Sequence, residues 1–242
     1  MARKPRNETA PGIHHVFARG NNRVAIFRRD ADRRVYLRLL AQTVARTRWR
    51  CLAFCLMSNH VHLVIETREP NLGKGMQYLH GQYARLFNNS HRRSGHLFQG
   101  RYGSVSVESD AQLFAVVRYV AMNPVEATLC QLPGDYPWSS CRSVLTAEGL
   151  PYVDTERLLS YFEGLGGDGR RRYRELVEVR GEPTRAGAPP ETSPVGNHAG
   201  ADGLAEPPAA TPGRSRTKRG RKGGKRPTHG RRQTKRKRRR PP

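Results

Sequence analysis

The sequence has few cysteines, few acidic residues and no long apolar segment. Its four cysteines follow no dense spacing pattern, which disfavours a disulfide-stapled secreted fold. No stretch approaches the roughly 20 apolar residues of a membrane span, and no apolar run follows the polar first residues. We therefore expect neither a membrane partner nor a signal peptide, and a cytoplasmic location. The pattern of a phosphate-binding glycine-rich loop is also absent, which disfavours a function driven by ATP.

What the sequence has in excess is positive charge. Lys+Arg 44 against Asp+Glu 20 gives a formal net charge of +24 at pH 7. Part of the excess lies in residues 1–180 and part in a tail, residues 181–242, that is rich in Pro, Ala, Gly and Thr and ends in an Arg/Lys run. The tail has too few apolar side chains to offset its ordering entropy, so we expect it to be disordered. The surplus predicts a polyanionic partner.

The pattern of apolar residues between the termini predicts an α+β fold. Alternation and turn residues predict strands, whereas helical spacing and capping residues predict helices. The strands are expected near residues 13–19, 51–57, 60–67 and 103–108, and the helices at 30–48, from 69–71 to about 87, and at 111–122, where Pro124 is expected to end the helix. This order is typical of a ferredoxin-like antiparallel sheet with helices on one face. Further helices are expected in residues 146–180, which we interpret as a helical extension.

Two histidines, His60 and His62, stand one residue apart in the third predicted strand. Alternate side chains of a strand share a face, so the two Cα atoms are about 7 Å apart and both rings can reach one cation. By itself this spacing leaves a metal site, a solvated pair and a hydrogen-bonded pair open. A zinc site that adds Cys51 and Cys55 is a further alternative, although strand cysteines usually act as small core residues.

A tyrosine and an amide are spaced one helical turn apart near the end of the third predicted helix. Tyr119 and Asn123 lie at i and i+4, so they share one helical face. Asn123 offers a carbonyl oxygen, which suits a hard cation such as Mg²⁺ or Mn²⁺. For any single tyrosine, packing of the ring with a hydrogen-bonded hydroxyl is the more frequent role.

Five stretches together resemble a known family. The His-Val-His of Ser58-Asn59-His60-Val61-His62 is similar to the histidine motif of the HUH single-tyrosine transposases. More narrowly, the chain resembles the REP-associated tyrosine transposases and their bacterial insertion-sequence relatives. The stretches that carry the resemblance, in the order typical of the family, are residues 12–22, 55–66, 95–102, 117–125 and 135–140.

The resemblance implies a catalytic domain over residues 1–145 and a specific chemistry. It implies that Tyr119 is the nucleophile and that His60, His62 and Asn123 hold a divalent metal, Mg²⁺ or Mn²⁺. The expected activity is cleavage and rejoining of single-stranded DNA at hairpins or repeats through a 5′-phosphotyrosine intermediate. Relatives occur as monomers and as dimers, so a homodimer is one of two states left open.

Basic and aromatic residues are expected to bind the DNA strand, most of them near the loop at 91–104. They are Arg19, Arg92, Arg93, Phe98, Arg101, Tyr102 and Arg118. The adjacent His14 and His15 face opposite sides of the first strand, and we expect them to have structural or DNA-contacting roles rather than to bind metal.

Two other functions stay open at this stage. A domesticated relative that binds hairpin DNA without mobilising it would retain the same motifs. An RNA-acting phosphoesterase of the two-histidine type is disfavoured, because that chemistry needs two separate His-x-Thr/Ser motifs and His62 is followed by Leu63-Val64.

Overall fold

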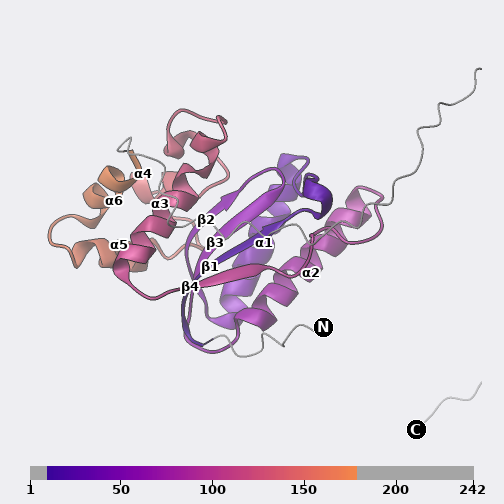
Figure 1. Ribbon diagram of the computed structural model, residues 1–242, viewed down its shortest axis with the longest axis horizontal. Coiled ribbons are helices and arrows are strands. Elements are labelled where there is room, and N and C mark those ends of the chain that lie inside the picture. The colour runs from indigo at the N-terminus through magenta and orange to yellow at the C-terminus, as the bar shows by residue number, and fades with distance from the viewer. Residues whose placement is uncertain (1–9, 179–242) are drawn as a thin grey trace, which may run out of the picture. The chain divides into compact units, whose positions relative to one another are not determined.

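A computed structural model of the chain describes residues 10–178, so the predicted disordered tail at 181–242 lies outside the described part. Four antiparallel strands form one sheet in the order β2-β3-β1-β4 (Figure 1). The strands are β1 (Gly12–Arg19), β2 (Arg50–Leu56), β3 (His60–Thr67) and β4 (Gly103–Val107). The helices are α1 (Asp30–Thr47), α2 (Leu72–Ser90), α3 (Asp110–Glu126), α4 (Cys141–Thr146), α5 (Thr155–Glu163) and α6 (Gly169–Glu178), with short 3₁₀ turns η1 (Asn21–Arg23) and η2 (Pro133–Asp135). The predicted α+β class and ferredoxin-like sheet are confirmed.

Helices cover both faces of the sheet rather than one. Helices α1 and α2 pack on the face that carries Val61, Leu63 and Ile65 of β3, whereas α3 to α6 pack on the face that carries Val64. The expectation of helices on a single face is therefore correct for α1 and α2 and wrong for α3. The physical reason is that β3 is apolar in both directions, so both of its faces need a covering layer.

Helix α3 is held against the sheet by the last two helices of the described part. The ring of Phe114 lies 4.6 Å from that of Phe162 in α5, and Phe162 lies 5.7 Å from Tyr173 in α6, measured between centroids. Phe162 and Tyr173 are almost completely buried. These contacts fix the position of α3 over the sheet.

Pro124 does not end the third helix, which is a second difference from the sequence prediction. Helix α3 continues through Pro124 to Glu126. Proline in the last turn removes a single backbone donor, and the Pro124 carbonyl still accepts from the Leu129 N–H at 2.9 Å. Asn123 is therefore in regular helical phase with Tyr119, and their side chains lie one above the other.

Among residues 10–178, no helix combines the length and the apolar character that a membrane crossing requires.

The close approach of Trp49 to α2 gives a stability prediction. A Cβ atom added at Gly75 would lie 2.1 Å from the Trp49 ring, and that ring is tethered because its Nε1 donates to Asn71 Oδ1 at 2.6 Å. We expect Gly75→Ala to lower the free energy of unfolding by about 1–3 kcal/mol, despite the better helix propensity of alanine. Denaturant unfolding monitored by circular dichroism measures this change.

The matched control is Gly81→Ala in the same helix, where an added Cβ meets nothing within 4 Å. This variant should be unchanged or more stable by up to about 1 kcal/mol. Equal stability of the two variants would contradict the packing argument.

Candidate active site

The two histidines of β3 lie near the middle of the sheet, on the face that α3 covers. His62 pairs with Phe17 of β1 on one side and with Cys55 of β2 on the other, and only 3% of its surface is exposed. His60, at the start of β3, is half-buried. Their ring centroids are 5.1 Å apart with planes at 82°. Because strands flank β3 on both sides, the backbone that carries the two rings is firmly held.

Helix α3 brings Tyr119 onto these rings. The Tyr119 ring lies 5.3 Å from that of His62 and is nearly perpendicular to it, at 85°. Burial raises the pKa of the Tyr119 phenol, while its hydrogen bond with Asn123 and the charge of Arg19 act in the opposite direction. The phenol is therefore protonated at neutral pH and needs a route for its proton before it can act as a nucleophile.

Asn123 joins the same cluster from one turn further along α3. Its Oδ1 lies 3.0 Å from Nε2 of His60, and its side chain is 9% exposed. On the other side of the His60 ring, Nδ1 lies 2.7 Å from Oδ1 of Asn59. His60 is thus held between two amide side chains, one from the turn before β3 and one from α3.

The imidazoles of this cluster are neutral near pH 7. Burial lowers the pKa of His60, although its hydrogen bond with Asn123 partly offsets the effect. Burial and the neighbouring rings of His15 and His60 hold the pKa of His62 well below its usual value. Neutral imidazoles keep a lone pair, which is the form that binds a metal ion.

His15 is a member of the cluster that the sequence reasoning missed. Its Nε2 lies 3.0 Å from Nδ1 of His62, and the two rings are stacked with centroids 5.2 Å apart. The neighbouring His14 points to the other face of the sheet, where its Nε2 lies 3.1 Å from the Ala10 carbonyl oxygen. The alternation of strand side chains indicated that one of the two must face the site, but not which one, since that depends on the pairing of β1 with β3.

The nitrogen and oxygen atoms of this cluster that could bind a metal fit a hard cation. Neutral His60 has one N–H group. If that group donates to Asn59, the Nε2 lone pair faces the Asn123 oxygen, and two acceptors brought together in this way suit a positive ion. Their 3.0 Å separation equals that of adjacent ligand atoms in an octahedral site with bonds of about 2.1 Å. Within residues 10–178, no group of three His, Cys, Asp or Glu side chains is arranged to hold a metal, so a site here has to include the amide.

Cys51 and Glu66 do not join the cluster, and Cys55, although it lies opposite His62 in the strand pairing, completes no group of three His, Cys, Asp or Glu metal ligands within residues 10–178. Cys51 and Cys55 belong to the hydrophobic layers on opposite faces of the sheet, and burial raises the pKa of the Cys51 thiol to about 12. The zinc alternative is therefore excluded. Glu66 is paired with Arg157 of α5 through two contacts of 3.0 and 2.9 Å, which fasten that helix to β3.

The residues predicted to bind DNA fall into separate groups. Arg19 is exposed and lies opposite His60 in the β1–β3 pairing, and its charge acts on Tyr119, so it is close to the cluster. Arg118 immediately precedes Tyr119 in α3 and is half-buried. Arg92 and Arg93 follow the end of α2, and the Arg93 guanidinium lies 5.9 Å from the centre of the Phe87 ring.

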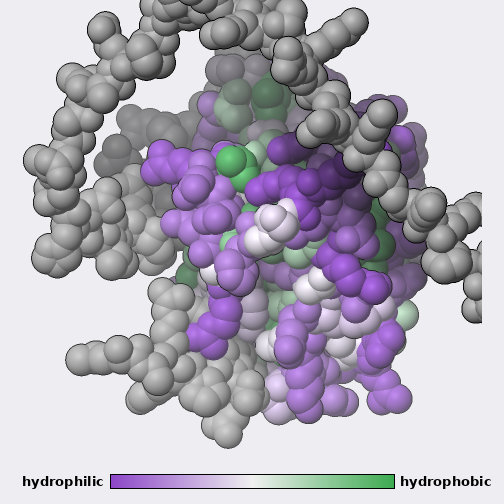
Figure 2. Space-filling model, turned by 90° about the vertical axis from the view of Figure 1, so that its right-hand side faces the viewer, coloured by the Kyte–Doolittle hydropathy of each residue, from purple (hydrophilic) through white to green (hydrophobic). Residues whose placement is uncertain are grey.

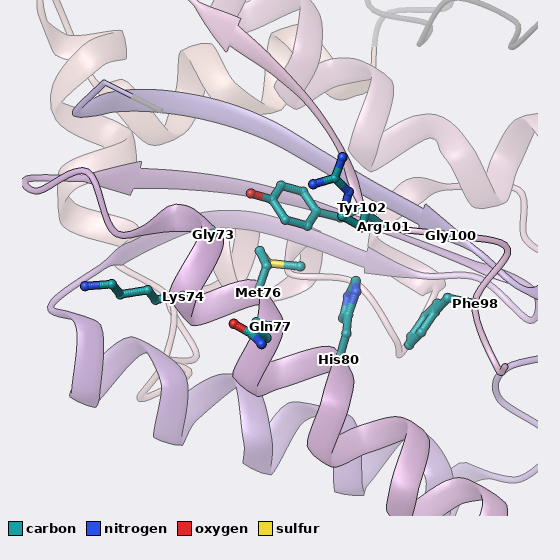
Figure 3. A pocket seen from close by; sticks show the side chains of 9 residues that line it. All are labelled: Gly73, Lys74, Met76, Gln77, His80, Phe98, Gly100, Arg101 and Tyr102. Carbon is teal, nitrogen blue, oxygen red and sulfur yellow. The ribbon is translucent and has the colours of Figure 1, made fainter. Parts of the chain in front are cut away.

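The remaining three line a pocket on the opposite side of the sheet. This pocket, of about 420 Å³, lies between α2 and the segment that leads into β4 (Figure 3). Phe98 and Tyr102 are mostly buried, and the Phe98 ring stacks on His80 at 4.3 Å, whereas Arg101 is exposed. Lys74 of α2 also lines the pocket, and nothing in the sequence indicated it. The two aromatic rings therefore form part of the pocket wall and do not project freely from the surface.

Comparison with known proteins finds one family over this region. Residues 11–123 match the family described as "Transposase IS200 like". A curated relative from Haemophilus influenzae, named as a REP-associated tyrosine transposase, is 27% identical over 122 residues, which cover 46% of this chain and 69% of the relative. The resemblance found in the sequence motifs is confirmed.

A solved structure has the same fold. It is that of a REP-associated tyrosine transposase bound to a REP hairpin, and it aligns with a TM-score of 0.50 and 16% sequence identity over 63% of this chain and 90% of that chain. At this identity the match shows a shared architecture.

Proposed function

Because residues 11–123 match the IS200-like transposases, we propose that this protein cuts and rejoins single-stranded DNA through Tyr119, with a divalent metal held by His60, His62 and Asn123. One observation carries the proposal. A single turn of α3 puts a phenol 5.3 Å from the His62 ring and an amide oxygen 3.0 Å from His60 Nε2. A nucleophile and three metal-binding groups from two separate elements therefore meet at one place.

The metal has a limited and definite role in this proposal. Bound by two neutral imidazoles and an amide oxygen, Mg²⁺ or Mn²⁺ would withdraw charge from a phosphate oxygen of the DNA. His60 and His62 are fixed by the sheet, whereas Asn123 belongs to α3. The ligand set thus ties the helix of the nucleophile to the strands beneath it.

The chemical step uses the phenol of Tyr119. Its Oη attacks the phosphorus of a phosphodiester, the phenolic proton leaves, and the bond between phosphorus and the 3′-oxygen breaks. The 3′-oxygen takes up a proton, and the 5′-phosphate stays on the tyrosine. The new phosphodiester bond conserves the energy of the old one, so a second 3′-hydroxyl can reverse the step without ATP. Arg19, whose charge lowers the pKa of the phenol, favours loss of its proton.

The DNA is proposed to be a single strand or a hairpin, bound through basic groups on both sides of the sheet. The solved structure that shares the fold was determined with a REP hairpin. Figure 2 views the molecule from the right-hand side of Figure 1, where α2 lies, and most of the coloured side chains on this face are hydrophilic. A homodimer, the division into residues 1–145 and 146–180, and a cytoplasmic location stay predictions.

The pocket beside α2 supplies a test of DNA binding. Lys74 and Arg101 line the pocket, and both are exposed. We expect the double variant Lys74→Ala/Arg101→Ala to bind a single-stranded hairpin flank more weakly. Its plot of log affinity against log salt should be shallower by about 1.4, because each lost phosphate contact on single-stranded DNA contributes about 0.7. Fluorescence anisotropy at several salt concentrations gives this slope.

The control removes the same charge from a distant surface. Arg142→Ala/Arg171→Ala alters two exposed arginines of α4 and α6, each of which faces a glutamate. Its salt dependence should match that of the wild type. If the slope of log affinity against log salt falls equally in both double variants, the DNA is bound diffusely and the pocket has no special role.

The decisive experiment for the proposed function looks for the covalent intermediate. The full-length protein is incubated with end-labelled hairpin DNA carrying single-stranded flanks, with Mn²⁺ added. A conjugate that survives denaturation, and that mass spectrometry assigns to Tyr119, is the expected product. Absence of any conjugate on every hairpin that the protein binds would favour the alternative of a hairpin-binding protein without cleavage activity.

A further inference from the structure

His15 contacts the proposed metal site without belonging to its ligand set. It extends from β1 on the same face as His62, and its Nε2 lies 3.0 Å from Nδ1 of that residue. Its ring centroid is also 5.8 Å from that of Tyr119. Within the described part of the chain, no three His, Cys, Asp or Glu side chains are arranged around a common ion position, so His15 does not act as a third imidazole ligand.

The direction of the hydrogen bond between His15 and His62 decides which nitrogen of His62 keeps the lone pair that can bind a metal. A neutral imidazole has one N–H and one lone pair. Either His62 donates from Nδ1 to His15, which leaves the lone pair on Nε2 of His62, or His15 donates to His62, which puts the His62 proton on Nε2. Only the first arrangement leaves a metal-binding lone pair on the nitrogen that does not face His15.

We propose that His15 is a positioning residue whose Nε2 accepts a hydrogen bond from Nδ1–H of His62, which keeps the Nε2 lone pair of His62 available for the metal. This inference rests on the proposed function, because it concerns the same metal site. A ring that binds metal through one nitrogen commonly donates a hydrogen bond from the other, which fixes the orientation of the ring and increases its basicity.

Burial gives this contact its importance. His15 and His62 are 1% and 3% exposed, so water does not replace a lost partner. The Phe17 ring lies 5.5 Å from His15 and 6.4 Å from His62, and it fills the space beside both. Gly103 of β4 leaves room for that ring, since a Cβ there would lie 2.3 Å from it. The two imidazoles are thus confined to the orientation in which their nitrogens meet.

The experiment measures Mn²⁺ binding in the absence of DNA. Isothermal calorimetry and the electron paramagnetic resonance signal of free Mn²⁺ are recorded for the full-length wild type, His15→Phe and His15→Gln. Phenylalanine keeps the ring but removes the acceptor, and we expect a 10- to 100-fold weaker affinity. Glutamine retains an oxygen near the position of Nε2, and its affinity should be within a few-fold of the wild type.

His14→Phe is the matched control, because it makes the same change on the same strand but on the other face of the sheet. Its Mn²⁺ affinity should equal that of the wild type. Thermal midpoints of all variants are recorded, so that a loss of stability is separated from a loss of binding. Wild-type affinity in His15→Phe overturns the inference while the proposed function stands. If the wild type itself binds no Mn²⁺, the proposed metal site fails and the inference fails with it.

A spectroscopic measurement on the unaltered protein tests the same point if His15→Phe does not fold. Long-range ¹H–¹⁵N correlation spectra identify the protonated nitrogen of each neutral imidazole. We expect His62 to be protonated at Nδ1. A proton on Nε2 of His62 would overturn the inference.

Discussion

Tyr119→Phe is expected to abolish the covalent protein–DNA conjugate, with cleavage reduced by about 10⁴-fold or more, while hairpin binding is nearly unchanged. The variant removes the only atom proposed to attack phosphorus, and loss of an essential nucleophile has effects of this size in other enzymes. The phenylalanine ring still fills the space 5.3 Å from His62, so the fold and the DNA-binding surface should be retained. Labelled hairpin DNA, analysed on denaturing gels and by anisotropy, gives both quantities.

Tyr161→Phe is the control for this change. The Tyr161 hydroxyl accepts from Arg157 at 2.5 Å, in α5 and outside the cluster, so this variant also loses a hydrogen-bonded phenol. It should form the conjugate at the wild-type level. A conjugate that persists in Tyr119→Phe, or that mass spectrometry assigns to another tyrosine, would refute the assigned nucleophile.

The second large effect concerns the metal. We expect His60→Ala and His62→Ala each to weaken Mn²⁺ binding by about 100-fold or more and to reduce conjugate formation in parallel, because each removes one of three proposed ligands. Chelation of the metal from the wild type should have the same effect on cleavage. Hairpin binding should persist in all three cases, since it depends on the basic surface.

Both variants should also lose stability. His60→Ala leaves the buried Asn123 amide without its partner, which is expected to cost about 1–3 kcal/mol. His62→Ala leaves His15 buried without its partner, which is expected to cost about 1–3 kcal/mol. His96→Ala, at an exposed histidine of the loop after α2, should change neither the Mn²⁺ affinity nor the stability. Undiminished Mn²⁺ binding by His60→Ala would argue against the ligand set.

The sequence was sufficient to group the residues whose relation is local. His60 and His62 share a face because strand side chains alternate, and Tyr119 and Asn123 share a face because they are one helical turn apart. That the two pairs meet was implied by the family resemblance, and the structure puts them in contact.

Relations between distant segments were not predictable in the same way. The facing of His15 towards the site depends on the register of β1 against β3. The partner of Glu66, Arg157, lies 91 residues away in a helix whose docking no local pattern indicates. Phe98 was read as available to a base, but its ring is covered by His80 from α2. In each case the outcome was decided by a tertiary contact that neither residue reveals by itself.

The packing of α3 also has a practical consequence for shortened forms of the protein. The region that matches the family stops at Asn123, inside α3, whereas the aromatic contacts of this helix reach Phe162 and Tyr173. A fragment that ended at residue 123 would keep every proposed catalytic group. It would lack α5 and α6, whose aromatic side chains pack against α3 and hold Tyr119 over the histidines. The boundary of similarity is therefore not a boundary of folding, and an expression fragment intended for catalysis should run at least to the end of α6.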